Sequence, residues 1–495
     1  MEKIAVLCDM HLSEKKSIQY AFLQRVVERM RQDDIRTVIC LGDMTSFGQL
    51  EAWGLYEEAM RDFEHYDIMG NAEVRDLATR DCLKEILGTV KFKIAGRSVY
   101  GLNTSDREIT LEDRERLCNI KDGDIILMHH APQKLVDNSR DWITDLMEHN
   151  AITILHGHEH CASEGFSGKS RVIGFRALDP DKALGNFPSI SYLEISDTSI
   201  EQRECTFGIA STVMKDLSNY FGLSCVDNHK DVRYAIENSV KYIELRCNAK
   251  DWQPDMELLP LLDEWRRKTD GYLSMHFPNL QWESGTLRGK KQWIEAIEYA
   301  LLVKADSLTI HPPRVNNSDM HKGGEVWNEL LNLYVDAVNN MPCNVKIGIE
   351  NIHVSKNDTC DEYRPFGVIP EDVLAWIDAI NEAVECKERV GHVLDVGHAR
   401  NNKSFAQKYP IGSWYDIMGN KTVAYHIHQV TRTEKGLKNH RAIENWFGPM
   451  INYTSFFWCW GQGIINHVPV FLEVKGSENF EKSMLAFDNV LLREE

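Results

Sequence analysis

The sequence lacks any long run of apolar residues. No stretch approaches the ~20 residues that a membrane-spanning helix needs, so we expect no membrane partner. The first residues already form an apolar strand pattern, KIAVLCD, which leaves no room for a signal peptide. These two absences predict a cytoplasmic protein.

Cysteine motifs are also missing. The 12 cysteines are scattered, and none forms the CxxC pair that is typical of a cysteine-rich zinc module. Cys8, Cys40 and Cys225 fall inside apolar strand patterns, so we expect buried, reduced thiols rather than disulfides, as is usual in the cytoplasm. Repeats and low-complexity tracts are absent as well.

Basic residues are scarce relative to acidic ones. The chain has 56 Lys and Arg against 75 Asp and Glu, which gives a net charge of −19, shared almost equally by its two halves. Such a protein is not a generic binder of polyanions, because that kind of binding depends on many Lys and Arg contacts to phosphate. Bound divalent cations would restore a local attraction to phosphate, which leaves room for an acidic nuclease.

The length indicates two domains. A chain of 495 residues exceeds the usual size of one hydrophobic core, and 43% hydrophobic residues suffice for two. We place the first domain at 1–200 and the second at 210–495, with the polar stretch DTSIEQREC as the joint. The sequence leaves the oligomeric state open.

Five short motifs lie in order in the first domain, each after an apolar run that is typical of a buried strand. Their residues would meet at one edge of a sheet. Mixed carboxylate, imidazole and amide donors favour Mn, Zn or Fe over Ca. The motifs are CDMHLS with Asp9 and His11, LGDM with Asp43, MGNAE with Asn71, MHHAP with His129, and HGHEH with His158 and His160.

In order and residue type these motifs resemble the calcineurin-like metallophosphoesterase family, which implies an αββα sandwich and two metal ions. Such cations clamp phosphoryl oxygens and lower the pKa of a water molecule. By this resemblance Asp9, His11 and His160 would hold one metal ion, Asn71, His129 and His158 the other, and Asp43 would bridge them.

One position departs from the family pattern. The Asn is usually followed by a His that helps to protonate the leaving group, whereas Ala72 stands here. Loss of a general acid typically costs ~10²–10⁴-fold in rate. The departure favours substrates with good leaving groups, or a proton donor from elsewhere such as His130. It also allows a non-catalytic alternative, in which the first domain is a scaffold that binds a partner.

The second domain alternates short apolar strands with amphipathic helical stretches, which predicts a (β/α)₈ barrel with its site at the carboxyl ends of the strands. Polar residues occur at those ends in register, and His398 follows one turn after the sixth strand. The strands are FGLSCV, KYIELR, YLSMHF, SLTIHP, VKIGIEN, GHVLDVG, VAYHIHQ and VFLEVKG, and the residues are Glu244, His276, His311, Glu350, Asp395, His426 and Glu473.

This set resembles the xylose-isomerase-like superfamily, which includes sugar isomerases and epimerases and the apurinic endonuclease IV type. The resemblance implies that Glu350, Asp395, His426 and Glu473 bind metal. The nuclease branch adds further ligands that His276, His311 and His398 match. His440 is a candidate for another, although Lys438 stands where a paired Asp would be, so we expect two to three divalent ions in the barrel and two in the first domain.

Two other polar residues are ambiguous from the sequence. His428 would share the strand face of His426, and we expect it to support the site or contact substrate rather than bind metal. Glu244 either orients a ligand or is one.

Two enzymatic functions remain open at this point. The first is a bifunctional phosphoesterase that acts on nucleic acid or nucleotides through both domains. The alternative is a phosphatase for a sugar phosphate coupled to a metal-dependent isomerase or epimerase, in which Glu350 and Glu473 are the paired acid and base. Both interpretations require a phosphorylated substrate.

Overall fold

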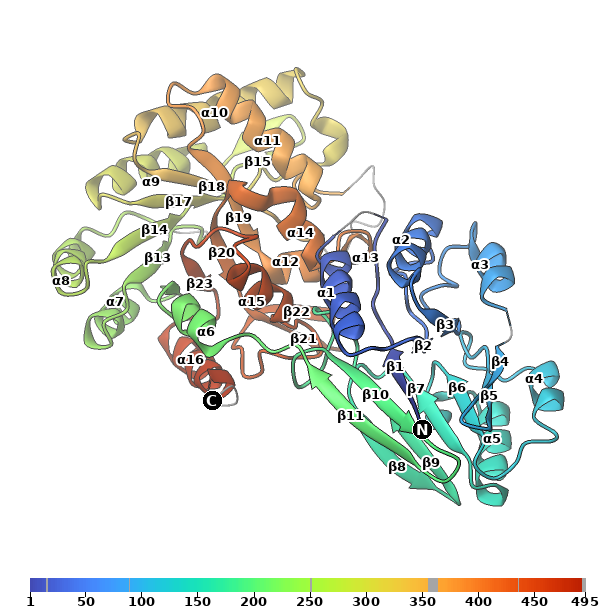
Figure 1. Ribbon diagram of the computed structural model, residues 1–495. Coiled ribbons are helices and arrows are strands. Elements are labelled where there is room, and N and C mark those ends of the chain that lie inside the picture. The colour runs from blue at the N-terminus through green and yellow to red at the C-terminus, as the bar shows by residue number, and fades with distance from the viewer. Residues whose placement is uncertain (15–16, 89, 250–251, 355–363, 435, 492–495) are drawn as a thin grey trace. The chain divides into compact units, whose positions relative to one another are not determined.

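The structure is a computed structural model that describes residues 1–14, 17–88, 90–249, 252–354, 364–434 and 436–491 (Figure 1). The chain divides into two compact units, Met1–Gly208 with Phe447–Ser455, and Ile209–Trp446 with Phe456–Glu495. The segment Phe447–Ser455 is placed in the second domain by the sequence-based boundaries. It packs in the first unit, where the Asn452 side chain donates to the Ala183 carbonyl.

The first unit contains two sheets that stack face to face. One has the order β11-β10-β1-β2-β3 and the other β4-β5-β6-β7-β9-β8. The bounds are β1 Glu2–Leu7, β2 Thr37–Cys40, β3 Glu64–Asp67, β10 Ser189–Ile195 and β11 Ile200–Thr206 in the first, and β4 Lys91–Ile94, β5 Arg97–Gly101, β6 Ile125–Met128, β7 Thr153–His156, β8 Ser163–Ser167 and β9 Ser170–Gly174 in the second.

Alternation of side chains explains how these sheets pack. In β6, Ile125 and Leu127 point into the core between the two sheets. Ile126 and Met128 point the other way and pack with Ile143 of an outer helix. The predicted αββα sandwich is confirmed. The helices of this unit are α1 Ile18–Gln32, α2 Leu50–Met60, α3 Arg80–Leu87, α4 Leu111–Arg116 and α5 Asp137–His149.

The second unit is a closed barrel of eight strands, in which every neighbouring pair is parallel. All eight predicted strands are confirmed, and their carboxyl ends lie on one rim, as they must in a parallel barrel. The strands are β12 Phe221–Ser224, β13 Tyr242–Arg246, β14 Tyr272–His276, β17 Ser307–Ile310, β18 Lys346–Glu350, β19 Val390–Asp395, β20 Thr422–Ile427 and β23 Val470–Leu472.

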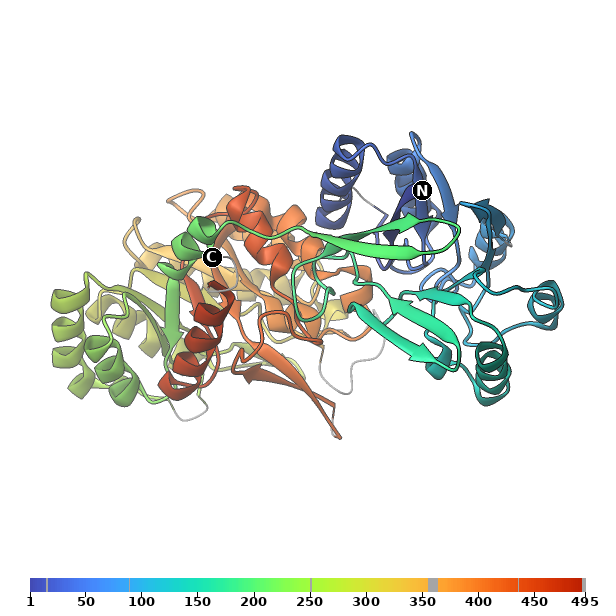
Figure 2. The same cartoon turned by 60° about the horizontal axis from the view of Figure 1, so that its bottom comes forward.

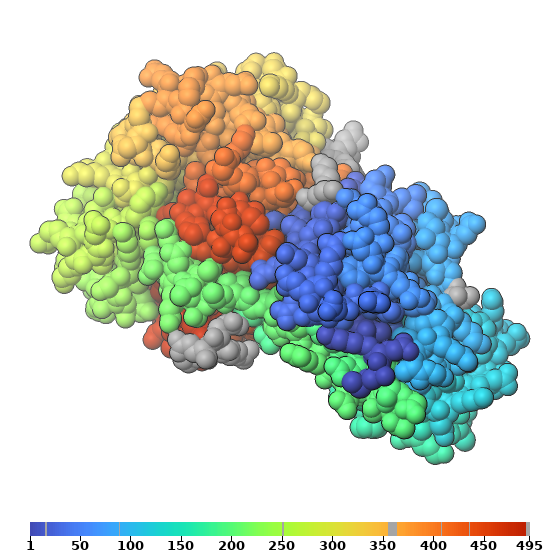
Figure 3. Space-filling view, viewed as in Figure 1, coloured from blue at the N-terminus to red at the C-terminus, as the bar shows by residue number. Residues whose placement is uncertain are grey.

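Helices surround the barrel strands (Figure 1), and in Figure 3 the yellow and orange surface is that of residues in the middle of the second unit. Two hairpins add to the carboxyl-end loops, and the second stands out from the barrel in Figure 2. They are β15 Gln281–Glu283 with β16 Thr286–Arg288, and β21 Gln429–Thr433 with β22 Gly436–Arg441. The helices are α6 Ser211–Ser218, α7 Asn228–Glu237, α8 Leu259–Thr269, α9 Lys290–Leu302, α10 Glu325–Asn340, α11 Pro370–Ala383, α12 Val396–Arg400, α13 Phe405–Lys408, α14 Ile411–Met418, α15 Thr454–Gly461 and α16 Ser477–Leu491.

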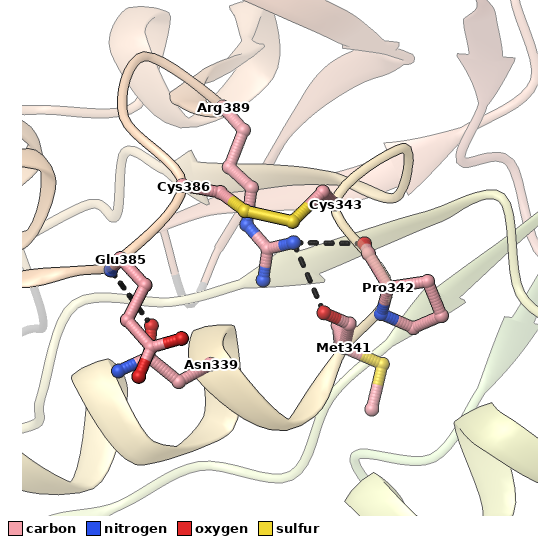
Figure 4. Close-up of a disulfide and its surroundings, with 7 residues drawn as sticks. All are labelled: Asn339, Met341, Pro342, Cys343, Glu385, Cys386 and Arg389. Atoms are coloured by element: carbon pink, nitrogen blue, oxygen red, sulfur yellow. Dashed lines mark hydrogen bonds between the residues drawn. A yellow bond between two sulfur atoms is a disulfide. The ribbon is translucent and has the colours of Figure 1, made fainter.

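One disulfide corrects the expectation that all cysteines are reduced. Cys343, between α10 and β18, is bonded to Cys386, between α11 and β19 (Figure 4). Arg389 crosses the same turns and donates to the carbonyls of Met341 and Pro342, at 3.0 and 2.7 Å. Neighbouring β/α units bring these turns together, which a separation of 43 residues in sequence does not reveal. The described cysteines other than this pair are free, Cys8, Cys40 and Cys225 among them.

Membrane-spanning helices were not expected, and none of the helices in the described ranges is long and apolar enough to be one.

His392 provides a test of burial that is independent of any activity. Its ring lies fully buried on β19 against Trp414, and neither nitrogen has a hydrogen-bond partner in the described part of the chain. Burial lowers the pKa of His392 to about 3. An unfolded His titrates near 6.5. On acidification, His392 is therefore protonated in the unfolded state at a higher pH than in the folded state. The free energy of unfolding falls as the pH falls below about 6.5.

We expect the titration of His392 to lower the free energy of unfolding by about 2 kcal/mol between pH 7.5 and pH 5. Chemical denaturation at both pH values, for the wild type and His392→Phe, measures the difference. Other buried histidines affect both proteins equally, so the variant should lose stability less steeply on acidification. Parallel pH profiles would contradict the assignment.

Candidate metal centres

The motif residues of the first unit meet at one sheet edge in an unusual backbone conformation. Asp9, His11, Asp43, His158 and His160 all have positive φ, between 48° and 68°. Residues other than glycine rarely adopt this region, and where they do the strain often marks a functional site. The tight turns after β1, β2 and β7 thus aim these side chains at a common point.

Asp43 lies between two groups of donors. Its Oδ2 is 3.3 Å from His11 Nε2, and its Oδ1 is 3.4 Å from His129 Nε2. Asp9, His11 and His160 offer ligand atoms that all lie within 4.8 Å of one another. Asp9 Oδ1 lies 3.4 Å from His160 Nε2. The structure therefore brings together the residues of the first predicted site and sets Asp43 beside it.

The second group contains Asn71, His129 and His158. The inward amide atom of Asn71, placed as oxygen, is 3.1 Å from His129 Nε2 and 2.8 Å from His158 Nδ1. These two ring nitrogens are 3.2 Å apart. A turned amide would donate to both ring nitrogens in their neutral form. With a cation, the inward oxygen and the two ring nitrogens would form a ligand set, because the contact of His129 Nδ1 with the Leu41 carbonyl at 2.8 Å leaves Nε2 for the ion.

The electrostatics of these groups suit a divalent cation. Burial alone would raise the pKa of Asp43, but His129 and His11 hold it well below its usual range. Burial likewise opposes a charged His129, yet Asp43 raises its pKa to about 9. Without metal the site thus holds a proton on His129, which a bound cation would displace. Asp9 Oδ1 and His11 Nδ1 are buried without a hydrogen-bond partner among the described residues, which also fits a metal site.

His130 lies next to this site, in contact with His158 at 4.1 Å between ring centroids. Its Nδ1 is 2.7 Å from the Thr104 carbonyl, which fixes the ring. Burial and the neighbouring His129 lower the pKa of His130 to about 3. The imidazole is therefore neutral near pH 7, and its predicted role as the proton donor stays a prediction.

Two buried carboxylates near this site escaped the sequence reasoning. Asp179, in the loop after β9, lies 3.5 Å from His11 Nδ1 and so orients that ring. Glu73 accepts backbone N–H groups of Asp43, Thr45 and Gly70, each at 2.9 Å. Glu73 thereby fixes the turn that carries Asp43. Glu73 is the last residue of the MGNAE motif and Asp179 lies outside all five motifs, and no spacing rule indicates the partner of either.

In the barrel, Glu350 at the end of β18 is the central carboxylate. Its Oε2 lies 3.1 Å from His276 Nε2 and 3.2 Å from His311 Nε2. Its Oε1 lies 3.3 Å from His398 Nδ1 and 3.5 Å from His426 Nδ1. Histidines from β14, β20, the loop after β17 and helix α12 therefore converge on one buried carboxylate.

A second group surrounds His426. His276, His426 and Glu473 offer ligand atoms within 4.8 Å of one another. Glu244 lies 3.0 Å from His426 Nε2 and accepts hydrogen bonds from two hydroxyl groups on the neighbouring strands β14 and β17. Glu244 therefore orients His426, which resolves the ambiguity left by the sequence in favour of a supporting residue.

A third group consists of His398, His428 and His440, whose ring nitrogens also lie within 4.8 Å of one another. His428 Nε2 lies 3.2 Å from Asp395 Oδ1, a contact that suits the supporting role expected of His428. Its place beside His398 and His440 also makes it a candidate ligand. Gly397 is required here because a Cβ would lie 1.9 Å from the His428 ring. His440, like the ligands of the first unit, has positive φ, 56°.

The barrel residues also fit cations electrostatically. Burial would raise the pKa of Glu350, but His311 and His426 hold it well below its usual range. Asp395 overcomes burial and raises the pKa of His398 to about 9. Both carboxylate oxygens of Glu350 and one of Glu473 are buried and accept no hydrogen bond from the described residues. Divalent ions would satisfy these oxygens.

The metal-binding groups open into a cavity of about 1030 Å³. Sequence reasoning missed most of its wall, because residues such as Arg246, Arg314 and His353 follow no motif. His353 follows β18 and stacks near His398, at 4.8 Å between ring centroids. The hairpin β15–β16 contributes Trp282.

His440 tests the third group. We expect His440→Ala to reduce the metal content by about one ion per chain, because removing one of three imidazoles leaves too few donors. Elemental analysis after dialysis measures this. His467→Ala is the control, since His467 contacts the Trp460 carbonyl at 2.9 Å and belongs to none of the three groups described above. Unchanged metal content in His440→Ala would leave the barrel with only two ions.

Comparison with known proteins agrees with this geometry. Residues 232–483 match the family described as xylose isomerase-like TIM barrel, and residues 2–162 match calcineurin-like phosphoesterase. No curated protein matches the chain.

Solved structures resemble each part in fold alone. A xylose isomerase domain protein from Alicyclobacillus acidocaldarius is 15% identical, with a TM-score of 0.37, over 55% of this chain and 98% of its own. A D-tagatose 3-epimerase-like protein is also 15% identical, with a TM-score of 0.38, over 56% and 98%. A dimetal phosphatase from Danio rerio is 11% identical, with a TM-score of 0.31, over 42% and 99%.

Proposed function

Because the chain belongs to the xylose isomerase-like TIM barrel family and carries a calcineurin-like phosphoesterase domain, we propose that it is a bifunctional metal-dependent phosphoesterase. In this proposal both units hydrolyse phosphoester bonds of nucleotides or nucleic acid. Residues of the first unit would hold two divalent ions, and those of the barrel two to three.

The observation that carries the proposal is the number of donors around Glu350. Four histidines contact its carboxylate, namely His276, His311, His398 and His426. Further donors adjoin these four, because His398 also groups with His428 and His440, and His426 with Glu473. This is more than one cation needs. Clusters of metal ions supply phosphoester hydrolysis with charge for the phosphoryl oxygens and a more acidic water.

The protein's own residues hold the ligand groups in position and exclude water from around them. Buried carboxylates and imidazoles hold fixed geometry at the floor of the cavity, and Glu244 and Asp179 orient two of the rings. The cavity volume of about 1030 Å³ is at the upper end for small-ligand sites. It suits a nucleotide, or one nucleotide at a break or end of a strand, better than a continuous polyanion bound to a chain of net charge −19.

The test is incubation of the metal-loaded protein with a duplex that contains an abasic site, and in parallel with nucleotides. We expect strand incision or release of phosphate, both lost on chelation and restored by metal. A fully metal-loaded protein that cleaves none of these substrates would overturn the proposal.

One observation favours a second candidate, in which the barrel isomerises a sugar phosphate. Glu350 Oε1 and Glu473 Oε2 lie 3.5 and 3.6 Å from the same nitrogen of His426, so two carboxylates flank one ligand position. This arrangement suits proton transfer beside a carbonyl. Interconversion of aldose and ketose by the wild type, absent in Glu473→Gln, would support it. If the abasic duplex is incised while sugars remain unchanged, this second function is wrong.

A further inference from the structure

Arg314 lies on the wall of the barrel cavity, three residues after His311. Its backbone is fixed to the hairpin β15–β16. The N–H group of Arg314 donates to the Leu280 carbonyl at 2.8 Å, and its carbonyl accepts from the N–H group of Trp282 at 3.0 Å. An isolated parallel bridge pairs Arg314 with Gln281. The side chain itself is exposed to the cavity, so a free guanidinium sits on a rigid base.

The charges around the cavity set Arg314 apart. The other arginine of the wall, Arg246, donates to Glu473 Oε1 at 3.1 Å and is therefore neutralised. Glu283 pairs with Arg288, also at 3.1 Å. Arg314 and Asp319 both line the cavity, but neither forms an ion pair with any residue that the structure describes. The wall thus offers one uncompensated guanidinium beside the metal-binding groups.

We propose that Arg314 binds an oxyanion of the barrel's substrate, a phosphate group other than the one that would react at the metal centre. A guanidinium can donate two parallel hydrogen bonds to one phosphate group. Recognition of a sugar hydroxyl or of a base does not require this paired arrangement. Because the backbone is already anchored, only the rotamer freedom of the side chain is lost on binding. The inference rests on the proposed function in assuming that the barrel accepts a phosphorylated substrate.

Two sources of such a phosphate share this chemistry. One is the terminal phosphate of a sugar phosphate, and the other is a phosphate next to the reacting one in a nucleotide chain. Trp282, the next residue along the paired hairpin strand, also lines the cavity. Stacking on an aromatic ring is worth more to a base than to a sugar, so Trp282 favours the nucleotide source.

The experiment compares two pairs of probes by calorimetric titration. One pair is fructose 6-phosphate and fructose, and the other is a thymidine dinucleotide with and without a 5′-phosphate. All proteins carry Asp43→Asn, so that the first unit does not consume the probes. We expect the phosphorylated member of at least one pair to bind more tightly, and Arg314→Gln to reduce that affinity about 10- to 100-fold. Affinity for the unphosphorylated member should stay unchanged.

Two further variants control for structure. Arg314→Lys keeps the charge but loses the paired hydrogen bonds, so an intermediate affinity is expected. Arg233→Gln removes an exposed arginine of α7 that does not line the cavity, and it should leave the affinity for every probe unchanged. Metal content is measured for each protein, because a variant that has lost metal does not report on Arg314.

The outcomes are separable. A loss in Arg314→Gln that is confined to fructose 6-phosphate identifies a sugar phosphate, and one confined to the dinucleotide identifies a nucleotide chain. Equal binding of both members of each pair, or no effect of Arg314→Gln in a metal-loaded protein, overturns the inference and leaves the proposed hydrolytic function standing. Phosphate binding through Arg314 without any cleavage of phosphoesters would sustain the inference and refute the proposed function.

Discussion

Asp43→Ala should abolish phosphoester hydrolysis by the first unit. The Asp43 carboxylate faces both donor groups, with His11 at 3.3 Å on one side and His129 at 3.4 Å on the other. Its Oδ1 also accepts the N–H group of Ala72 at 2.7 Å, which fixes the following turn. Without it the two cations would lose their shared ligand. The stabilisation at stake is several kcal/mol, or at least about a thousand-fold in rate.

The assay is hydrolysis of an activated aryl phosphoester. This substrate has a good leaving group and therefore does not need the proton donor that is missing where Ala72 stands. Asp124→Ala is the matched control. Asp124 is equally a buried Asp of this unit, but its carboxylate accepts the N–H groups of Ser98 and Lys121. It should lower thermal stability and spare the activity of the folded protein. Retention of activity within ten-fold in Asp43→Ala would mean that the two-ion arrangement is wrong.

The same variant decides whether the first unit is a catalyst or a scaffold. If Asp43→Ala and the wild type are equally inactive on activated esters although the wild type binds metal, the scaffold alternative is favoured. A wild type that turns over an activated ester but not an alkyl phosphate would show that Ala72 limits the substrate range.

The parts of the fold that could be predicted from the sequence are those that follow a repeating pattern. Eight apolar runs of similar length, each followed by an amphipathic stretch, admit few architectures apart from a barrel. Ligands such as Asp9 and Glu350 were found because parallel strands end on one edge, so residues at strand ends must meet.

Other features were inaccessible because they depend on contacts between distant segments. Strand alternation gives only the face on which His428 lies, and its proximity to His398 and His440 depends on tertiary structure. Arg314 lies in an irregular loop, where neither period nor motif applies. The disulfide likewise depends on the proximity of two turns.

Glu350→Gln should silence the barrel while leaving the first unit active. Gln has nearly the same shape, so packing at this fully buried position is preserved and only the charge is lost. Four histidines lie within 3.5 Å of the Glu350 carboxylate, and a neutral amide cannot bridge two cations as a carboxylate does. We expect loss of more than one metal ion per chain and at least about a thousand-fold loss of rate.

Glu244→Gln is the graded comparison, because Glu244 pairs with His426 whereas Glu350 pairs with four histidines. Loss of such an orienting partner typically costs 10- to 100-fold. The assignment therefore requires that Glu350→Gln be much more damaging than Glu244→Gln, with the aryl phosphoesterase activity of the first unit unchanged in both. Because the neighbouring histidines hold the pKa of Glu350 well below its usual range, its carboxylate stays ionised on acidification. The barrel's activity should then fall in acid because its histidines become protonated and release metal. Elemental analysis at the same pH would detect that loss of metal.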